Sequence, residues 1–125
     1  EGEIRSVVEQ IFLENKLYRL AGELSHGEKQ WLEIGMMLVQ HPKVLLLDEP
    51  VAGMTPKERE QTATLLRRVA SDKAILVIEH DMDFVENVAR DVTVMHQGSI
   101  LCEGPISKVK GDQRVIEVYL GEAHD

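Results

Sequence analysis

Apolar residues near the start of the chain recur every three or four positions. Ile4, Val7 and Val8 begin a stripe that Ile11 and Phe12 continue. This spacing predicts an amphipathic helix of about three turns.

A second helix is predicted directly after Ser25, following a connector over residues 15–23. Ser25 and Glu28 have the S-x-x-E spacing of a capping box, which marks a helix start. Apolar residues then occur on most sides, so we expect this helix to be well buried. It should end near His41-Pro42, because the residue before a proline leaves the helical region.

Two short apolar runs, residues 44–47 and 74–78, are predicted to be strands. Continuous apolar runs are typical of strands covered on both faces, as in a parallel sheet. A second capping box, Thr55 to Glu58 with proline at the first helical position, predicts a helix between them. Its apolar stripe consists of Thr62, Leu65, Leu66 and Val69.

The remainder of the chain predicts a helix, a hairpin and a short helical tail. Asp81 is a suitable N-cap for the helix, which follows the second strand. Residues 92–95 and 99–103 are expected to form the hairpin, with its turn at Gln97-Gly98. Residues 114–120 are expected to form the helical tail. The alternation of strands and helices indicates an α/β fold with a parallel sheet.

The length, net charge and cysteine content of the chain limit the classes of protein to which it could belong. The 125 residues suffice for one domain, and the sequence holds no apolar run long enough to span a membrane and no signal peptide. Because the first residue is Glu1 rather than Met, we expect the chain to be a piece of a longer protein. A net charge of −8 argues against nucleic acid as a partner, and Cys102, the lone cysteine, favours a reducing compartment.

Two adjacent carboxylates, Asp48 and Glu49, follow the first apolar strand. Ligands of parallel sheets bind beyond the carboxyl ends of the strands. There Asp48 could hold Mg²⁺, and Glu49 could position or deprotonate a water that attacks a phosphoryl group. The alternative is that the pair marks a solvated strand end.

The turn Ser25-His26-Gly27 could bind phosphate, since a helix N-terminus presents free N–H groups. An ordinary capping box is the alternative. His80 follows the second strand and could donate a hydrogen bond to a γ-phosphate, or it could simply be packed or solvated.

In this order and spacing, the motifs resemble the ATP-binding subunits of ABC transporters. Residues 24–28 are similar to the signature motif, residues 45–49 to the end of Walker B, and residues 51–55 lie at the D-loop. By this resemblance the cofactors are ATP and Mg²⁺. The implied roles are Asp48 for the metal, Glu49 as catalytic base, His80 as γ-phosphate sensor, and Ser25, His26, Gly27 and Glu28 as contacts to nucleotide held by the other subunit.

The resemblance is closest to the urea-uptake type, a relative of the branched-chain amino acid importers. It is carried by residues 24–36, 50–55, 96–99 and 114–121. It implies an importer ATPase, with urea as the expected solute and a branched-chain amino acid as the alternative. The implied partners are a second ATP-binding subunit and transmembrane permease subunits, at the cytoplasmic face of a bacterial-type membrane.

The sequence contains no G-x-x-x-x-G-K-[ST] loop. The resemblance therefore implies the C-terminal portion of the domain, a partial P-loop NTPase-like sheet flanked by helices. Residues 1–41 would belong to the helical subdomain, 42–95 to the core, and 96–125 to the hairpin and tail. We expect this chain alone to lack ATPase activity. A missing neighbouring strand would leave strand edges unpaired, so we expect the chain either to close the gap by rearranging or to self-associate through such an edge.

Three positions depart from the family pattern: His26 replaces a glycine, Glu28 a glutamine, and Thr55 an aspartate. Glu28 adds negative charge beside a phosphate site unless it turns back into the capping box.

Two other interpretations of the function remain: a soluble ABC ATPase that acts in DNA repair or on chromosomes, and a non-catalytic interaction domain. The proline after Asp48-Glu49, the histidine at 80 and the acidic charge disfavour the first of these.

Overall fold

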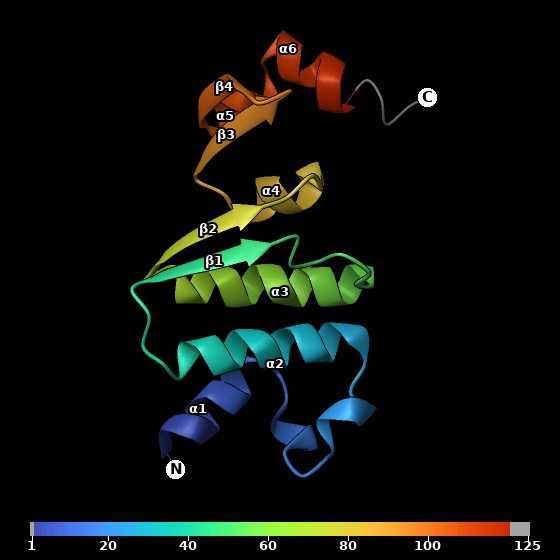
Figure 1. Ribbon diagram of the computed structural model, residues 1–125, viewed down its shortest axis with the longest axis vertical. Helices are drawn as coiled ribbons and strands as arrows, with labels where there is room; N and C mark the ends of the chain where they lie inside the picture. The colour runs from blue at the N-terminus through green and yellow to red at the C-terminus, as the bar shows by residue number, and fades with distance from the viewer. Residues whose placement is uncertain (1, 121–125) are drawn as a thin grey trace. The chain divides into compact units, whose positions relative to one another are not determined.

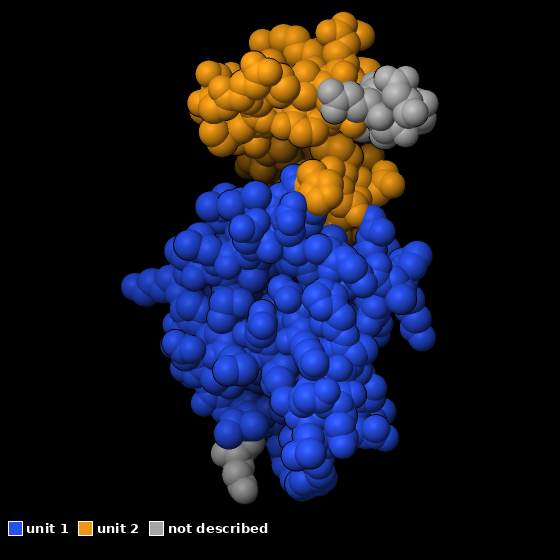
Figure 2. Space-filling view, turned by 45° about the vertical axis from the view of Figure 1, so that its right-hand side comes forward, with its two compact units in different colours: residues 1–79 blue, residues 80–125 orange. Residues whose placement is uncertain are grey.

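The computed structural model of the protein describes residues 2–120. The chain divides into two compact units, residues 1–79 and residues 80–125, which Figure 2 distinguishes by colour. The predicted α/β class is confirmed, because a parallel pair of strands is joined through a helix and covered by helices.

In the part of the chain that the structure describes, the first unit holds three α-helices and two strands. Figure 1 shows them in layers, with α3 against the strands, α2 against α3, and α1 beyond α2. Short 3₁₀ turns over Glu14–Lys16 and Ala21–Glu23 lie between the first two helices. The elements are α1 (Gly2–Gln10), α2 (His26–Leu38), β1 (Val44–Asp48), α3 (Pro56–Val69) and β2 (Ala74–Ile78).

Helix α1 is shorter than its apolar stripe. It ends at Gln10, and Phe12 has a left-handed backbone with a φ of 65°. Both later members of the stripe still pack inward: Ile11 is 2% exposed, and the Phe12 ring meets Trp31 edge-on with centroids 5.2 Å apart. The stripe therefore overran the helix end, and its first member, Ile4, is 57% exposed.

Helices α2 and α3 form the centre of the first unit. The Trp31 indole N–H donates to the Thr62 hydroxyl over 2.9 Å, and that hydroxyl donates to the Glu58 carbonyl over 2.8 Å. The predicted stripe of α3 is fully buried. The prediction that α2 is buried on most sides was wrong, because Met36 is 58% exposed. The buried residues of α2 all lie on one face of the helix: Gly27, Trp31, Ile34, Gly35 and Leu38.

Strands β1 and β2 pair in parallel, with Val44 opposite Ala74 and Asp48 opposite Ile78. Alternate residues of β1 are buried, namely Leu45 and Leu47, whereas Leu46 is 68% exposed. Coverage on both faces was therefore a wrong prediction for this chain. The helices cover one face, and the other exposes apolar side chains of both strands, Val44, Leu46, Leu76 and Ile78.

The second unit is built around an antiparallel hairpin. Among the described residues it contains α4 (Met82–Val88), β3 (Asp91–His96), β4 (Ser99–Pro105), α5 (Ile106–Lys110), α6 (Gln113–Val115) and a π-helical turn (Ile116–Leu120). Gln97 and Gly98 have φ values of 50° and 80°, the positive values that a two-residue type I′ turn requires. The predicted hairpin and the Asp81 cap are both confirmed, since the Asp81 carboxylate accepts from the Phe84 N–H.

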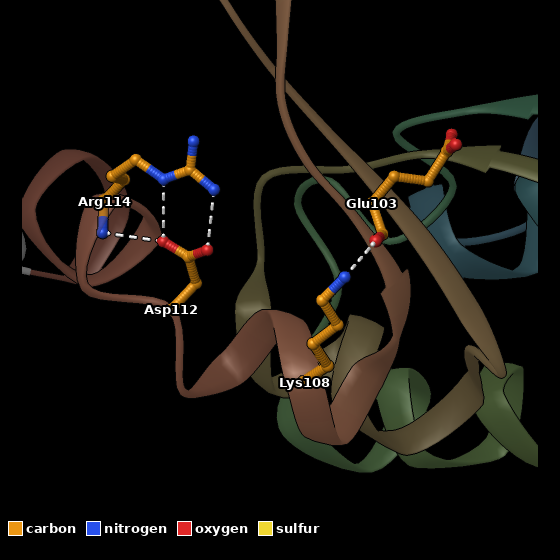
Figure 3. A network of polar contacts seen from close by, with 4 residues as sticks. All are labelled: Glu103, Lys108, Asp112 and Arg114. Atoms are coloured by element: carbon orange, nitrogen blue, oxygen red, sulfur yellow. Dashed lines mark hydrogen bonds and ion pairs between the residues drawn. The ribbon is translucent and has the colours of Figure 1, made fainter.

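A small core holds the hairpin to the last helices: Val94, Cys102, Val109 and Val115. Figure 3 shows two pairs of residues of this unit that are joined by polar contacts. The Asp112 carboxylate accepts three hydrogen bonds from Arg114, and Lys108 donates to the Glu103 carbonyl over 3.3 Å. The Arg114 bonds lower the pKa of Asp112, and burial raises the pKa of the Cys102 thiol.

Candidate functional site

Asp48 and Glu49 lie at the carboxyl end of β1, as predicted, with both side chains exposed. Glu49 has a left-handed backbone with a φ of 49°. Its N–H donates to the Ile78 carbonyl over 2.8 Å, and its own carbonyl accepts from the Ala52 N–H over 3.2 Å. The strand end thus turns sharply away from the sheet and leaves both carboxylates at its edge.

The Asp48 carboxylate suits a metal ion that arrives with nucleotide. Among the described residues, no group of three or more His, Cys, Asp or Glu side chains is arranged to hold a metal ion by itself. Mg²⁺ in nucleotide sites is held by one or two carboxylates together with phosphate oxygens and water. An exposed carboxylate at the strand end therefore fits Mg-ATP and does not form an all-protein cage.

The turn at residues 25–28 is a complete capping box. The Ser25 hydroxyl accepts from the Glu28 N–H over 3.2 Å, and the Glu28 carboxylate accepts from the Ser25 N–H over 2.9 Å. Because the Ser25 oxygen accepts this bond, its own hydroxyl hydrogen can donate to another group. The turn can therefore present a hydroxyl and the first N–H groups of α2 to an anion.

Lys16 neutralises the extra charge of this turn. Its ammonium pairs with the second carboxylate oxygen of Glu28. The Lys16 bond, followed by the bond from the Ser25 N–H, lowers the pKa of Glu28. Glu28 thus turns back into the capping box, and its negative charge is compensated from the 3₁₀ turn twelve residues earlier. The sequence held no signal for this pair, because Lys16 lies in a connector without periodicity.

His26 faces the turn after Glu49. Its Nε2 lies 2.9 Å from the Ala52 carbonyl oxygen. Gly53 follows with a φ of 75°, and a Cβ added there would lie 3.2 Å from the His26 ring. The structure thereby joins two predicted motifs, the turn at 24–28 and the turn at 51–55, through a histidine predicted to contact nucleotide.

Gly27 is buried where the starts of α2 and α3 meet. A Cβ on Gly27 would lie 2.3 Å from a carboxylate oxygen of Glu58. That carboxylate also closes the second capping box by accepting from the Thr55 N–H over 2.9 Å. The absence of a side chain at Gly27 therefore lets the two helix starts approach each other.

His80 immediately precedes the Asp81 cap of α4, and its side chain is exposed. It belongs to the second unit, whereas Asp48 and Glu49 belong to the first. The pairing of His80 with Glu49 in one site stays a prediction.

The comparisons with known proteins agree with these motifs. The ABC transporter family model matches residues 2–52. The branched-chain amino acid transport ATP-binding protein BraF of Pseudomonas aeruginosa is 36% identical over 118 residues, which cover 93% of this chain and 46% of BraF. A solved ATP-binding cassette of an ABC transporter in its ADP conformation superimposes with a TM-score of 0.83 at 34% identity, covering 96% of this chain and 49% of that one. The chain belongs to the ABC transporter ATP-binding proteins.

This ABC chain spans about half the length of the curated relatives it matches. LivG of Escherichia coli, a high-affinity branched-chain amino acid transport ATP-binding protein, is also 36% identical over 118 residues. Urea as the solute receives no support from these relatives, and the alternative reading, a branched-chain amino acid, is better supported. No helix among the described residues has the length and apolar character to cross a bilayer.

Proposed function

We propose that this chain is the part of an ABC importer ATPase that supplies the signature turn and the acidic end of Walker B. Support comes from the similarity to BraF and LivG over nearly the whole chain. The observation that carries the proposal is the turn at residues 25–28, where Glu28 turns back into the capping box and Lys16 offsets its charge.

In the proposed mechanism, the reaction transfers the γ-phosphoryl group of ATP to water. The exposed Glu49 carboxylate positions the attacking water and accepts its proton, while His80 donates a hydrogen bond to the γ-phosphate. Bound Mg²⁺, associated with Asp48, would neutralise charge on the phosphate oxygens. A positioned base of this kind contributes about 10²- to 10⁴-fold in rate.

Ser25 and the N–H groups of α2 are proposed to contact nucleotide held by a second ATP-binding subunit. A helix N-terminus suits an anion because its N–H groups are free and its dipole is positive. Permease subunits would carry the solute, and the ATPase would sit at the cytoplasmic face of the membrane. Relatives named for branched-chain amino acid transport favour a solute of that class over urea.

The chain by itself is expected to bind ATP weakly. Its net charge is −8, and the sequence offers no phosphate-binding loop with a lysine to offset that charge. Calorimetric titration of the 125-residue chain with Mg-ATP should show no binding tighter than about millimolar, a loss of some 4 kcal/mol relative to micromolar affinity. Micromolar binding would contradict this expectation.

The decisive test of function is Glu49→Gln in the ATP-binding subunit that contains this chain. The amide keeps the size of the side chain but removes the base, so the variant should bind ATP, fail to hydrolyse it and stop uptake. Glu33→Gln, an exposed change on α2, is the matched control. Uptake assays with labelled leucine and labelled urea identify the solute, and unchanged hydrolysis in Glu49→Gln would refute the proposed role.

A further inference from the structure

Glu49 adopts a backbone conformation that must be held by its surroundings. Its φ of 49° places a residue with a side chain in the left-handed region, a strained conformation that persists only where neighbouring groups impose it. The Ile78 carbonyl holds its N–H, and the Ala52 N–H holds its carbonyl. The second of these bonds depends on where the Ala52 peptide lies.

His26 holds the backbone of the same turn through the carbonyl group of Ala52. Its Nε2 contacts the Ala52 carbonyl over 2.9 Å, and since a carbonyl oxygen only accepts, Nε2 must carry the proton. The ring also lies against Gly53, where a Cβ would come within 3.3 Å of Nε2 and where φ is 75°. A glycine at 53 therefore admits both the turn and the imidazole.

We propose that His26 is a positioning residue for Glu49, acting through residue 52. The hydrogen bonds run from the imidazole to the Ala52 carbonyl, and from the Ala52–Glu49 turn to the backbone of the proposed base. The proposal rests on the proposed function, because it takes Glu49 as the base. It gives a physical role to the histidine that replaces the family's glycine at this position.

This role differs from a direct contact with nucleotide. The Nε2 proton is already donated within the chain, so only Nδ1 remains for a ligand. A nucleotide contact would change how tightly ATP binds, whereas a positioning residue would change how fast bound ATP reacts. The two roles can therefore be separated by kinetics.

The test compares His26→Ala, His26→Gln and the control Glu33→Ala in the ATP-binding subunit that contains this chain. Loss of the imidazole frees the turn, so His26→Ala should lower kcat about 3- to 30-fold with KM within about twofold. The glutamine amide can donate to the Ala52 carbonyl, so His26→Gln should recover most of kcat. Hydrogen exchange of the Ala52 amide should quicken in His26→Ala and return toward the unmodified rate in His26→Gln.

A raised KM with unchanged kcat would overturn the proposal and make His26 a nucleotide contact. Unchanged exchange at Ala52 in His26→Ala would overturn it as well. If the unmodified subunit hydrolysed no ATP, the proposed function would fail, and the exchange measurement would still decide whether His26 holds the turn.

Discussion

Helices α2 and α3 both begin with a capping box, but the two boxes make different contacts with the rest of the chain. Each has a hydroxyl cap whose oxygen accepts from the backbone three residues on, and each has a glutamate that accepts from the cap's own N–H. At α2 the glutamate, Glu28, also pairs with Lys16. At α3 the corresponding Glu58 lies against Gly27 of the other turn.

The difference fits the proposal that one capping box contacts a ligand while the other contributes to packing. Lys16 compensates the charge of Glu28 beside the proposed phosphate position. Glu58 instead fills the space that Gly27 leaves open. The residues outside each box, rather than the box itself, therefore assign the two roles.

The largest expected effect comes from the contact that ties the two helices together. Trp31→Ala removes a buried indole and its bond to Thr62, and should lower the free energy of unfolding by about 3–5 kcal/mol. Trp31→Phe keeps an aromatic ring but loses the N–H and part of the buried volume, so we expect a smaller loss of about 1–3 kcal/mol. Chemical denaturation measures both, and a cost below about 1 kcal/mol for Trp31→Ala would show that the two helix starts are held independently.

Gly27→Ala should be the next largest change. The added methyl displaces the Glu58 carboxylate, which breaks the second capping box and costs about 1–2 kcal/mol. In a Glu58→Ala background the same change should be neutral or stabilising, which a double-mutant cycle would reveal. Gly22→Ala, with nothing within 4 Å of its Cβ, is the control; equal effects in both backgrounds would argue against the contact.

Ser25→Ala and Thr55→Ala should destabilise the chain to similar extents. Each removes the oxygen that accepts a backbone N–H at a helix start, a loss of about 1 kcal/mol. Thermal unfolding of the two variants compares them directly. A cost at only one position would mean that the two boxes are not equivalent in stability.

Lys16→Met should have the smallest effect and a distinctive pH dependence. The pair is partly exposed, so we expect a loss of about 0.5–1 kcal/mol at neutral pH. Because folding lowers the pKa of Glu28, the stabilisation is present above its unfolded pKa, near 4.3, and disappears as pH falls through the lower folded pKa. Denaturation at pH 7 and pH 3 measures this difference, and a loss of the same size at both pH values would contradict the assignment to Glu28.

Local features of this fold could be predicted from the sequence. Both capping boxes, both strands and the Gln97-Gly98 hairpin turn follow from residues within a few positions of one another. The exposed face of the sheet could not be predicted, because Leu46 occurs in an apolar run that reads the same whether one face or both are covered. The order of the motifs also predicted the family, while the relatives favoured a different solute from the one expected.

Contacts between motifs escaped prediction because they join distant residues. Lys16 and Glu28 are separated by 12 positions and His26 and Ala52 by 26. Neither pair follows a helical or strand spacing in the sequence; the first depends on how the 3₁₀ turn at Glu14–Lys16 lies beside α2, and the second on how α2 lies beside the turn after β1. The departures at His26 and Glu28 could be seen in the sequence, but their physical explanation required the tertiary structure.

The most direct test of the central claim uses the two cap variants again, now in the ATP-binding subunit with Glu49→Gln to block hydrolysis. Mg-ATP-dependent dimerisation is measured by sedimentation for Ser25→Ala and Thr55→Ala. Because a hydrogen bond to a charged phosphate is worth about 1.5–3 kcal/mol, Ser25→Ala should weaken dimerisation about 10- to 100-fold, while Thr55→Ala changes it less than about threefold. Equal weakening by the two variants, or none by Ser25→Ala, would contradict the claim that the start of α2 contacts nucleotide.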